Sequence, residues 1–243
     1  MRFPTVLLDF DHTLFDSDAS ELAAFDSTMR AAGVADPARH FDAYVRINLP
    51  LWAAVERGEL RPQDVRVRRF EQLAGEIGLD ADPAAMAEWF VTGLAAHGQL
   101  YPGARAVLDD LAGRCRLALV TNGLSEVQRT RVERLGIGAY FDAVVISAEI
   151  GSSKPAASFF DVTFELLGGP ARHATLMVGD SLSADVRGGA DYGLTTCWYN
   201  PHRRAAAGAG AHHEIERLEQ LPPLVTGDPW PGEGATPGVG RTS

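Results

Sequence analysis

The chain has 243 residues, of which 46% are hydrophobic and 22% are charged, and its formal net charge at pH 7 is −10. This length allows a well-packed core in one large domain or in two smaller ones. The acidic balance argues against a surface for a nucleic-acid polymer or an anionic membrane, although a small anion still fits a locally positive pocket.

The sequence predicts a cytoplasmic protein. No stretch approaches the roughly 20 apolar residues that span a bilayer, and the beginning of the chain lacks the layout of a signal peptide. Cys115 and Cys197 are far apart and form no paired motif, which is typical of reduced thiols.

The first predicted element is a buried strand that ends in two carboxylates. Residues 6–8 form an apolar run, which favours a central strand of a parallel sheet. Asp9 and Asp11 follow it, and alternation along a strand places them on one side. Because two carboxylates held so close repel each other, we expect a bound divalent metal to neutralise their charge. The alternative at this point is an Asp-rich turn that begins a helix.

Residues 16–97 predict helices only. Apolar residues recur at helical spacing over residues 20–32, 41–52 and 67–77, and again after Pro83. Asp82 and Pro83 have the order of an N-cap and a first helical residue, whereas Pro50 interrupts the second segment.

From Tyr101 onward, predicted helices alternate with short apolar strands. The strands lie at residues 117–120, 143–147, 175–178 and 195–198, and the helices at residues 104–111, 125–135, 155–167 and 184–192. Ser125 and Gln128 have the spacing of a capping box. This succession predicts an α/β fold with a doubly wound, Rossmann-like parallel sheet.

The helical block is therefore an insertion after the first strand. We expect an α/β core formed by residues 1–15 and 98–221 and a helical cap formed by residues 16–97. Residues 222–243 are rich in Pro and Gly, and we expect this tail to be disordered.

Polar residues gather after the carboxyl ends of four predicted strands. They are, in chain order, Asp9, Asp11, Thr121, Asn122, Lys154, Asp180, Ser181 and Asp185. Each alone has an ordinary explanation as a turn, cap or surface residue. Because the carboxyl ends of parallel strands meet at one edge, the combination indicates a ligand site.

Lys154 is the only lysine, whereas the other 21 basic residues are arginines. The two residue types are nearly interchangeable on a solvated surface, so a single lysine suggests a place that needs a compact ammonium. The alternative is retention by chance.

The chain resembles the haloacid dehalogenase-like (HAD) superfamily of phosphotransferases. Four motifs carry the resemblance in the expected order: D-F-D-H-T from Asp9, T-N-G from Thr121, K-P from Lys154 and G-D-S-L-S-A-D from Gly179. The resemblance implies an enzyme in which Asp9 attacks phosphorus and forms an aspartyl-phosphate. Asp11 would protonate the leaving oxygen and then deprotonate the hydrolytic water.

The same resemblance implies the remaining roles. Thr121, Asn122 and Lys154 would hold the phosphoryl group, with Lys154 also neutralising Asp9. Mg²⁺ would bind Asp9, the Asp11 carbonyl and Asp180, with Asp185 and Ser181 in support. Members that act on carbon–halogen bonds lack the acid at the Asp11 position, so its presence favours phosphate chemistry. We expect His12 to be a turn residue rather than a metal ligand.

The insertion is similar to the cap of the pyrimidine 5′-nucleotidases. The likeness rests on D-H-T-L-F-D from Asp11, I-N-L-P-L-W-A-A-V-E-R-G-E-L from Ile47, V-R-V-R-R-F from Val65 and W-Y-N from Trp198. It implies a small phosphorylated substrate, with a nucleoside 5′-monophosphate favoured. We expect Trp52 and Phe70 to be cap core, and Arg46 and Asn48 to be candidates for substrate contact.

Other functions stay open from the sequence. Within the superfamily these are a phosphatase for sugar phosphates or acylneuraminate phosphates, or a phosphomutase. Outside it, a phospho-accepting signalling domain has similar residues but about half the length. The G-D-S-L letters at Gly179 also spell a serine-esterase signature, but that family carries it near the start of the chain. A catalytically silent binding protein is disfavoured because no expected catalytic residue is missing.

Overall fold

The computed structural model describes residues 1–205 and 210–229 of the chain. Its centre is a sheet in which all neighbouring strands are parallel, in the order β3-β2-β1-β4-β5-β6. The strands are β1 (Thr5–Leu8), β2 (Arg116–Thr121), β3 (Ala143–Ile146), β4 (Thr175–Gly179), β5 (Thr195–Tyr199) and β6 (His213–Ile215). The predicted doubly wound parallel sheet is therefore confirmed, and β6 is an additional strand that the sequence analysis did not predict.

Strand β1 lies in the middle of the sheet because its side chains are apolar on both faces. Val6 and Leu8 belong to a hydrophobic cluster that includes residues of α5 and α10, whereas Leu7 belongs to a second cluster with Phe159 and Phe160 of α8. The side chains of Val6, Leu7 and Leu8 are completely buried. The strand therefore delivers the residues that follow it to the interior of the molecule.

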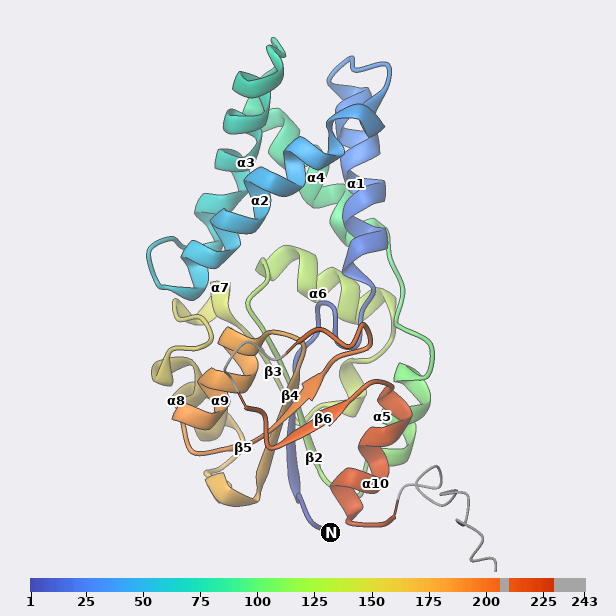
Figure 1. The fold of residues 1–243 in the computed structure, drawn as a ribbon, viewed down its shortest axis with the longest axis vertical. Helices are drawn as coiled ribbons and strands as arrows, with labels where there is room; N and C mark the ends of the chain where they lie inside the picture. Colours follow the sequence, from blue (N-terminus) through green and yellow to red (C-terminus); the bar gives the residue numbers. More distant parts are fainter. Residues whose placement is uncertain (206–209, 230–243) are drawn as a thin grey trace, which may run out of the picture.

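Helices flank the sheet on both faces (Figure 1). They are α5 (Ala104–Leu111), α6 (Ser125–Arg134), α7 (Ser147–Ile150), α8 (Ala157–Leu166), α9 (Gly188–Asp191) and α10 (Leu221–Thr226). A π-helical segment, Leu182–Arg187, leads from the loop after β4 into α9. None of the helices in the described part of the chain is both long and apolar enough to cross a membrane.

The inserted helices form a separate layer beyond the carboxyl ends of the strands (Figure 1). They are α1 (Ser17–Ala31), α2 (Phe41–Glu56), α3 (Pro62–Ile77) and α4 (Pro83–Ala96). These helices enclose a hydrophobic cluster of their own, with Tyr44, Phe70 and Phe90 among its aromatic residues. Val91 of α4 also packs on Leu124 and Val127, so the cap contacts the core through α4 and α6.

Two local predictions are corrected. Helix α2 continues through Pro50, which lacks an amide hydrogen, because apolar residues on both sides of it pack into the cap core. The predicted capping box is wrong, since Leu124 is the N-cap of α6 and no side chain caps it. Ser125 donates to Glu149 at 2.6 Å instead, and Gln128 donates to Asp11 and Thr121.

The prediction of a disordered tail is wrong for residues 222–226, which belong to α10. Leu221, Pro222 and Val225 are buried, and the Val225 carbonyl accepts hydrogen bonds of 3.0 Å from the amides of Arg2 and Phe3. Burial on the sheet therefore outweighs a composition that is typical of disorder. Residues 230–243 lie outside the described residues.

Candidate active site

The carboxyl ends of the central strands bring the predicted site residues together beneath the cap. Asp9 follows β1, Thr121 ends β2, and Asp180 follows β4. Lys154 lies in the loop between α7 and α8. Since β1 pairs with β2 on one side and with β4 on the other, residues distant in sequence share one small volume.

Lys154 is a deeply buried charged residue at this site, with 1% of its surface exposed. Its Nζ atom lies 2.7 Å from Asp9 Oδ1 and 2.6 Å from Asp185 Oδ1, and it donates to the Val120 carbonyl at 3.0 Å. Burial disfavours the ammonium, but the charges of Asp185 and Asp9 outweigh it and hold the pKa of Lys154 above its usual value. The sole lysine therefore fills a position that holds a compact cation with three acceptors.

Asp9 carries a buried charge that Lys154 compensates only in part. Burial raises the pKa of Asp9 from 3.8 to about 7, with a further increase from the charge of Asp185 and a decrease from Lys154. Thr13 Oγ1 donates to Asp9 Oδ2 at 3.0 Å. A second cation beside Asp9 would favour its charged form.

Asp9, Asp180 and Asp185 form a carboxylate cluster that fits a divalent metal. One oxygen atom from each lies within 4.8 Å of the others, and oxygen is the ligand type that Mg²⁺ prefers. Burial raises the pKa of Asp180 to about 6, and the charge of Asp9 adds to the effect. The buried Asp9 and Asp185 and the partly exposed Asp180 face the ammonium of Lys154, and Arg204 Nη2 lies 3.5 Å from Asp180 Oδ2. Three carboxylates against two cations leave an excess of negative charge that a metal would neutralise.

Asp185 has a supporting position in this cluster, because both its oxygen atoms already have partners. Oδ1 pairs with Lys154 at 2.6 Å, and Oδ2 accepts from the Ser181 amide at 3.0 Å. Ser181 Oγ accepts from the Ala184 amide at 3.1 Å and donates to Glu56 of the cap at 3.2 Å. Ser181 thus caps the π-helical segment and contacts the cap.

Asp11 lies at the same edge of the sheet with a different set of partners. Its Oδ1 atom accepts from Ser17 Oγ at 2.6 Å and from Arg131 Nη1 at 2.9 Å. Its Oδ2 atom accepts from Gln128 Nε2 and lies 3.4 Å from Thr121 Oγ1. Burial alone would raise the pKa of Asp11, but the positive charge of Arg131 and these hydrogen bonds hold it below its usual value.

The side chain of Asn122 has partners that the sequence did not predict. Its Nδ2 atom donates to the Lys154 carbonyl and its Oδ1 atom accepts from the Lys154 amide, both at 2.8 Å. Both polar groups of the side chain are therefore engaged with the Lys154 backbone. The side chain therefore joins Asn122 to the loop that carries Lys154, and the expected phosphate-binding role of Asn122 stays a prediction.

Gln128 and Arg131 of α6 belong to the site, although the sequence analysis did not identify them. Both are almost completely buried in a helix whose other residues are mostly polar. Gln128 Nε2 also donates to Thr121 Oγ1 at 2.8 Å. The sequence did offer a signal: Gln128 and Arg131 are three residues apart, so they lie on one face of a helix. That helix follows the T-N-G motif, which already carried site residues.

The residues singled out in the turn and the cap have mixed outcomes. His12 has a φ of 58°, as a turn residue does, and its Nδ1 atom lies 3.6 Å from Asp18.

In the cap, Phe70 is completely buried in the hydrophobic cluster, and Trp52 packs against that cluster. Arg46 pairs with Glu76 at an exposed position. Asn48 donates to Glu21 at 2.7 Å, while its buried Oδ1 atom has no partner.

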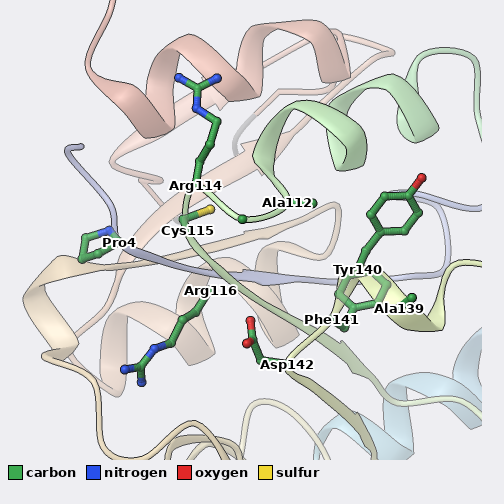
Figure 2. A pocket seen from close by; sticks show the side chains of 10 residues that line it. Pro4, Ala112, Arg114, Cys115, Arg116, Ala139, Tyr140, Phe141 and Asp142 are labelled. Carbon is green, nitrogen blue, oxygen red and sulfur yellow. The ribbon is translucent and has the colours of Figure 1, made fainter.

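A separate cavity of about 470 Å³ lies at the opposite, amino end of the sheet (Figure 2). Its charged side chains already have partners: Arg114 pairs with Asp110, Arg116 donates to the Leu167 carbonyl, and Asp142 accepts from the Leu117 amide. The catalytic candidates all lie at the other end of the strands, so this cavity is not the candidate active site.

Similarity to known proteins agrees with this geometry. The pyrimidine 5′-nucleotidase PynA of Streptococcus pneumoniae is 37% identical over 203 residues, which cover 83% of this chain and 86% of that protein. The pyrimidine 5′-nucleotidase YjjG of Escherichia coli is 35% identical over 225 residues, which cover 91% of this chain and 98% of that protein.

The HAD-hydrolase YfnB of Bacillus subtilis, solved with bound magnesium, has a similar structure. The TM-score is 0.87 at 32% sequence identity, over 93% of this chain and 100% of that one. Residues 3–193 match the family of haloacid dehalogenase-like hydrolases. The chain therefore belongs to the haloacid dehalogenase-like hydrolase family.

Proposed function

We propose that this hydrolase cleaves phosphate monoesters through an aspartyl-phosphate on Asp9, and that its substrates are nucleoside 5′-monophosphates with a pyrimidine base. The observation that carries the chemistry is the contact of Lys154 with Asp9 beside two further carboxylates. This arrangement supplies a nucleophile, a cation and a set of metal ligands in one place.

The proposed reaction has two steps. In the first, a carboxylate oxygen of Asp9 forms a bond to phosphorus while the bond from phosphorus to the ester oxygen breaks. Asp11 gives its proton to that oxygen, so the alcohol leaves neutral. In the second, water attacks the phosphorus and Asp11 takes its proton. The bond between Asp9 and phosphorus breaks, and inorganic phosphate is released.

The other residues position and neutralise charge. We assign the phosphoryl oxygens to Thr121 and Lys154, with Asn122 holding the Lys154 backbone. Asp9, the Asp11 carbonyl and Asp180 would hold Mg²⁺, with Asp185 in support. Bound Mg²⁺ supplies charge neutralisation on the phosphoryl group. Phosphoryl transfer depends mainly on such positioning and electrostatics.

The substrate class rests on similarity. The relatives PynA and YjjG are pyrimidine 5′-nucleotidases and align over most of the chain. A sugar phosphate, an acylneuraminate phosphate or a phosphomutase reaction is the alternative within the same chemistry. A phospho-accepting signalling protein would form phospho-Asp9 without turnover.

The test is phosphate release from a panel of nucleotide and sugar monophosphates, with Mg²⁺ or with EDTA. We expect Mg²⁺-dependent release that favours UMP, dUMP or dTMP and is lost in Asp9→Asn. Asp26→Asn is the matched control, because Asp26 is an exposed carboxylate paired with Arg30. Release from sugar phosphates only would contradict the substrate class. Stable phospho-Asp9 without release would contradict hydrolysis.

A further inference from the structure

We propose that Arg131 is a positioning residue that holds Asp11 so that its Oδ2 atom is the one that exchanges the proton. This inference rests on the proposed phosphatase function. It concerns a residue of α6 that lies outside all four sequence motifs.

The two oxygen atoms of Asp11 have different partners. Oδ1 accepts from Arg131 at 2.9 Å and from Ser17 at 2.6 Å. Oδ2 lies on the side of Thr121, at 3.4 Å from its hydroxyl, and Thr121 is a proposed ligand of the phosphoryl group. Oδ1 is engaged by a guanidinium, whereas Oδ2 accepts from the neutral amide of Gln128. The carboxylate is therefore held with Oδ2 on the phosphate side, where a leaving group would lie.

Arg131 can fix this orientation because it is itself fixed. It is 3% exposed, and each of its guanidinium nitrogens has a partner. Nε donates to the Leu94 carbonyl and Nη2 to Ser20 Oγ, both at 2.9 Å, while Nη1 binds Asp11. The guanidinium carbon also lies 4.2 Å from the centre of the Phe15 ring, so both its edge and its face are held.

Gln128 completes the arrangement from the same helix. Its Oε1 atom accepts from Arg131 Nη1 at 3.3 Å, and its Nε2 atom donates to Asp11 Oδ2 and to Thr121 Oγ1. Gln128 therefore joins the residue that holds Asp11 to the residue proposed to hold phosphate. A lysine at position 131 would lack the fork that contacts Asp11, Leu94 and Ser20 at once.

Two substrates with different leaving groups distinguish a positioning role of Arg131 from a general structural role. An acid is needed to expel the alkoxide of a nucleotide, whereas dinitrophenolate leaves without a proton. If Arg131 acts through Asp11, its loss slows phosphoryl transfer from a nucleotide much more than transfer from 2,4-dinitrophenyl phosphate. If Arg131 only supports the fold, the two substrates lose rate together.

The experiment measures single-turnover formation of phospho-Asp9 from dUMP and from 2,4-dinitrophenyl phosphate. The variants are Arg131→Met, Arg131→Lys and Asp11→Asn, and thermal unfolding of each is recorded. Arg134→Met is the matched control: it lies one turn further along α6 and donates to the carbonyls of Ala95, His97 and Gly98, without a contact to Asp11.

We expect Arg131→Met to slow transfer from dUMP by about 10- to 100-fold, with at most about a threefold change for dinitrophenyl phosphate. Arg131→Lys should show the same selectivity in a milder form, so the test stands if the Met variant does not fold. Asp11→Asn combined with Arg131→Met should be no slower than Asp11→Asn alone.

Equal losses on both substrates, or the same selectivity in Arg134→Met, would overturn the positioning role. Failure of the wild-type enzyme to form phospho-Asp9 from either substrate would instead refute the proposed function on which the inference rests.

Discussion

The carboxylate of Asp185 lies 2.6 Å from the ammonium of Lys154, and both residues are 1% exposed. Because Lys154 also contacts Asp9, one ammonium separates two buried carboxylates. Removal of the cation leaves two charges facing each other in a medium that solvates them poorly.

We therefore expect Lys154→Met to be destabilised by about 3 to 5 kcal/mol at neutral pH, the usual effect of breaking a buried ion pair. Urea unfolding measures the change, and phosphate release should be lost as well. Lys154→Arg tests the need for a compact cation and should also lose most activity. Arg30→Met is the control, since its partner Asp26 is exposed. Equal stability of the two Met variants would contradict this prediction.

The carboxylate cluster predicts how stability depends on pH without metal. The pKa of Asp9 is about 7 in the folded protein against 3.8 for a free side chain. Over this interval the folded state binds more protons than the unfolded state, so this group's contribution to stability falls as pH rises. Above the folded-state pKa the loss is complete. In EDTA, the Tm of the wild type should therefore decline relative to Asp9→Asn between about pH 4 and 7.

Magnesium should reverse this decline, because it binds the deprotonated carboxylates. We expect Mg²⁺ to raise the Tm of the wild type more at pH 8 than at pH 5, and to have little effect on Asp180→Asn. Differential scanning calorimetry with and without EDTA checks this. A shift of equal size at both pH values would argue against a metal site formed by these carboxylates.

Position 123 needs a glycine because the Gln128 side chain occupies the space of a Cβ atom, and not because of its backbone φ angle. A Cβ atom at position 123 would lie 2.3 Å from Gln128 Nε2, so Gly123→Ala should displace the amide that contacts Asp11 and Thr121. We expect phosphate release to fall by about tenfold or more, as a small misplacement near the chemistry does. Gly75→Ala is the control, since nothing lies within 4 Å of its Cβ position and alanine favours a helix. Unchanged activity in Gly123→Ala would contradict the role of Gln128.

Helix α10 should contribute to stability. Val225 is completely buried in the main cluster of the core. We expect Val225→Ala to lower the free energy of unfolding by about 2 kcal/mol, from lost burial and the cavity that remains. Leu166→Ala at an exposed site is the control. Equal urea midpoints for the two variants would show that α10 is not part of the folded unit.

The sequence predicted the sheet and most of the site because these features depend on local patterns. Apolar runs such as residues 6–8 identify buried strands, and Asp9, Thr121 and Asp180 follow such runs directly. Their convergence follows from the parallel sheet alone. The lone Lys154 was informative for a reason that the structure makes clear: its ammonium is buried among three acceptors.

Features that depend on tertiary contacts were missed. Gln128 and Arg131 lie on a largely polar helix, and only the packing of α6 against the cap explains why these two are buried. The Pro-rich composition around Pro222 is typical of disorder, yet both prolines fit the first turn of α10. The side-chain partners of Asn122 come from the distant Lys154 loop and could not be predicted from its own motif.

The single lysine makes the site directly observable. Since Lys154 is the only lysine of the chain, protein produced with isotope-labelled lysine carries one labelled side chain, and that side chain touches both Asp9 and Asp185. Its magnetic resonance signal reports on these two carboxylates without assignment of the remaining residues. Titrations with magnesium, phosphate or a nucleotide can then be followed at one atom in the unmodified wild-type sequence.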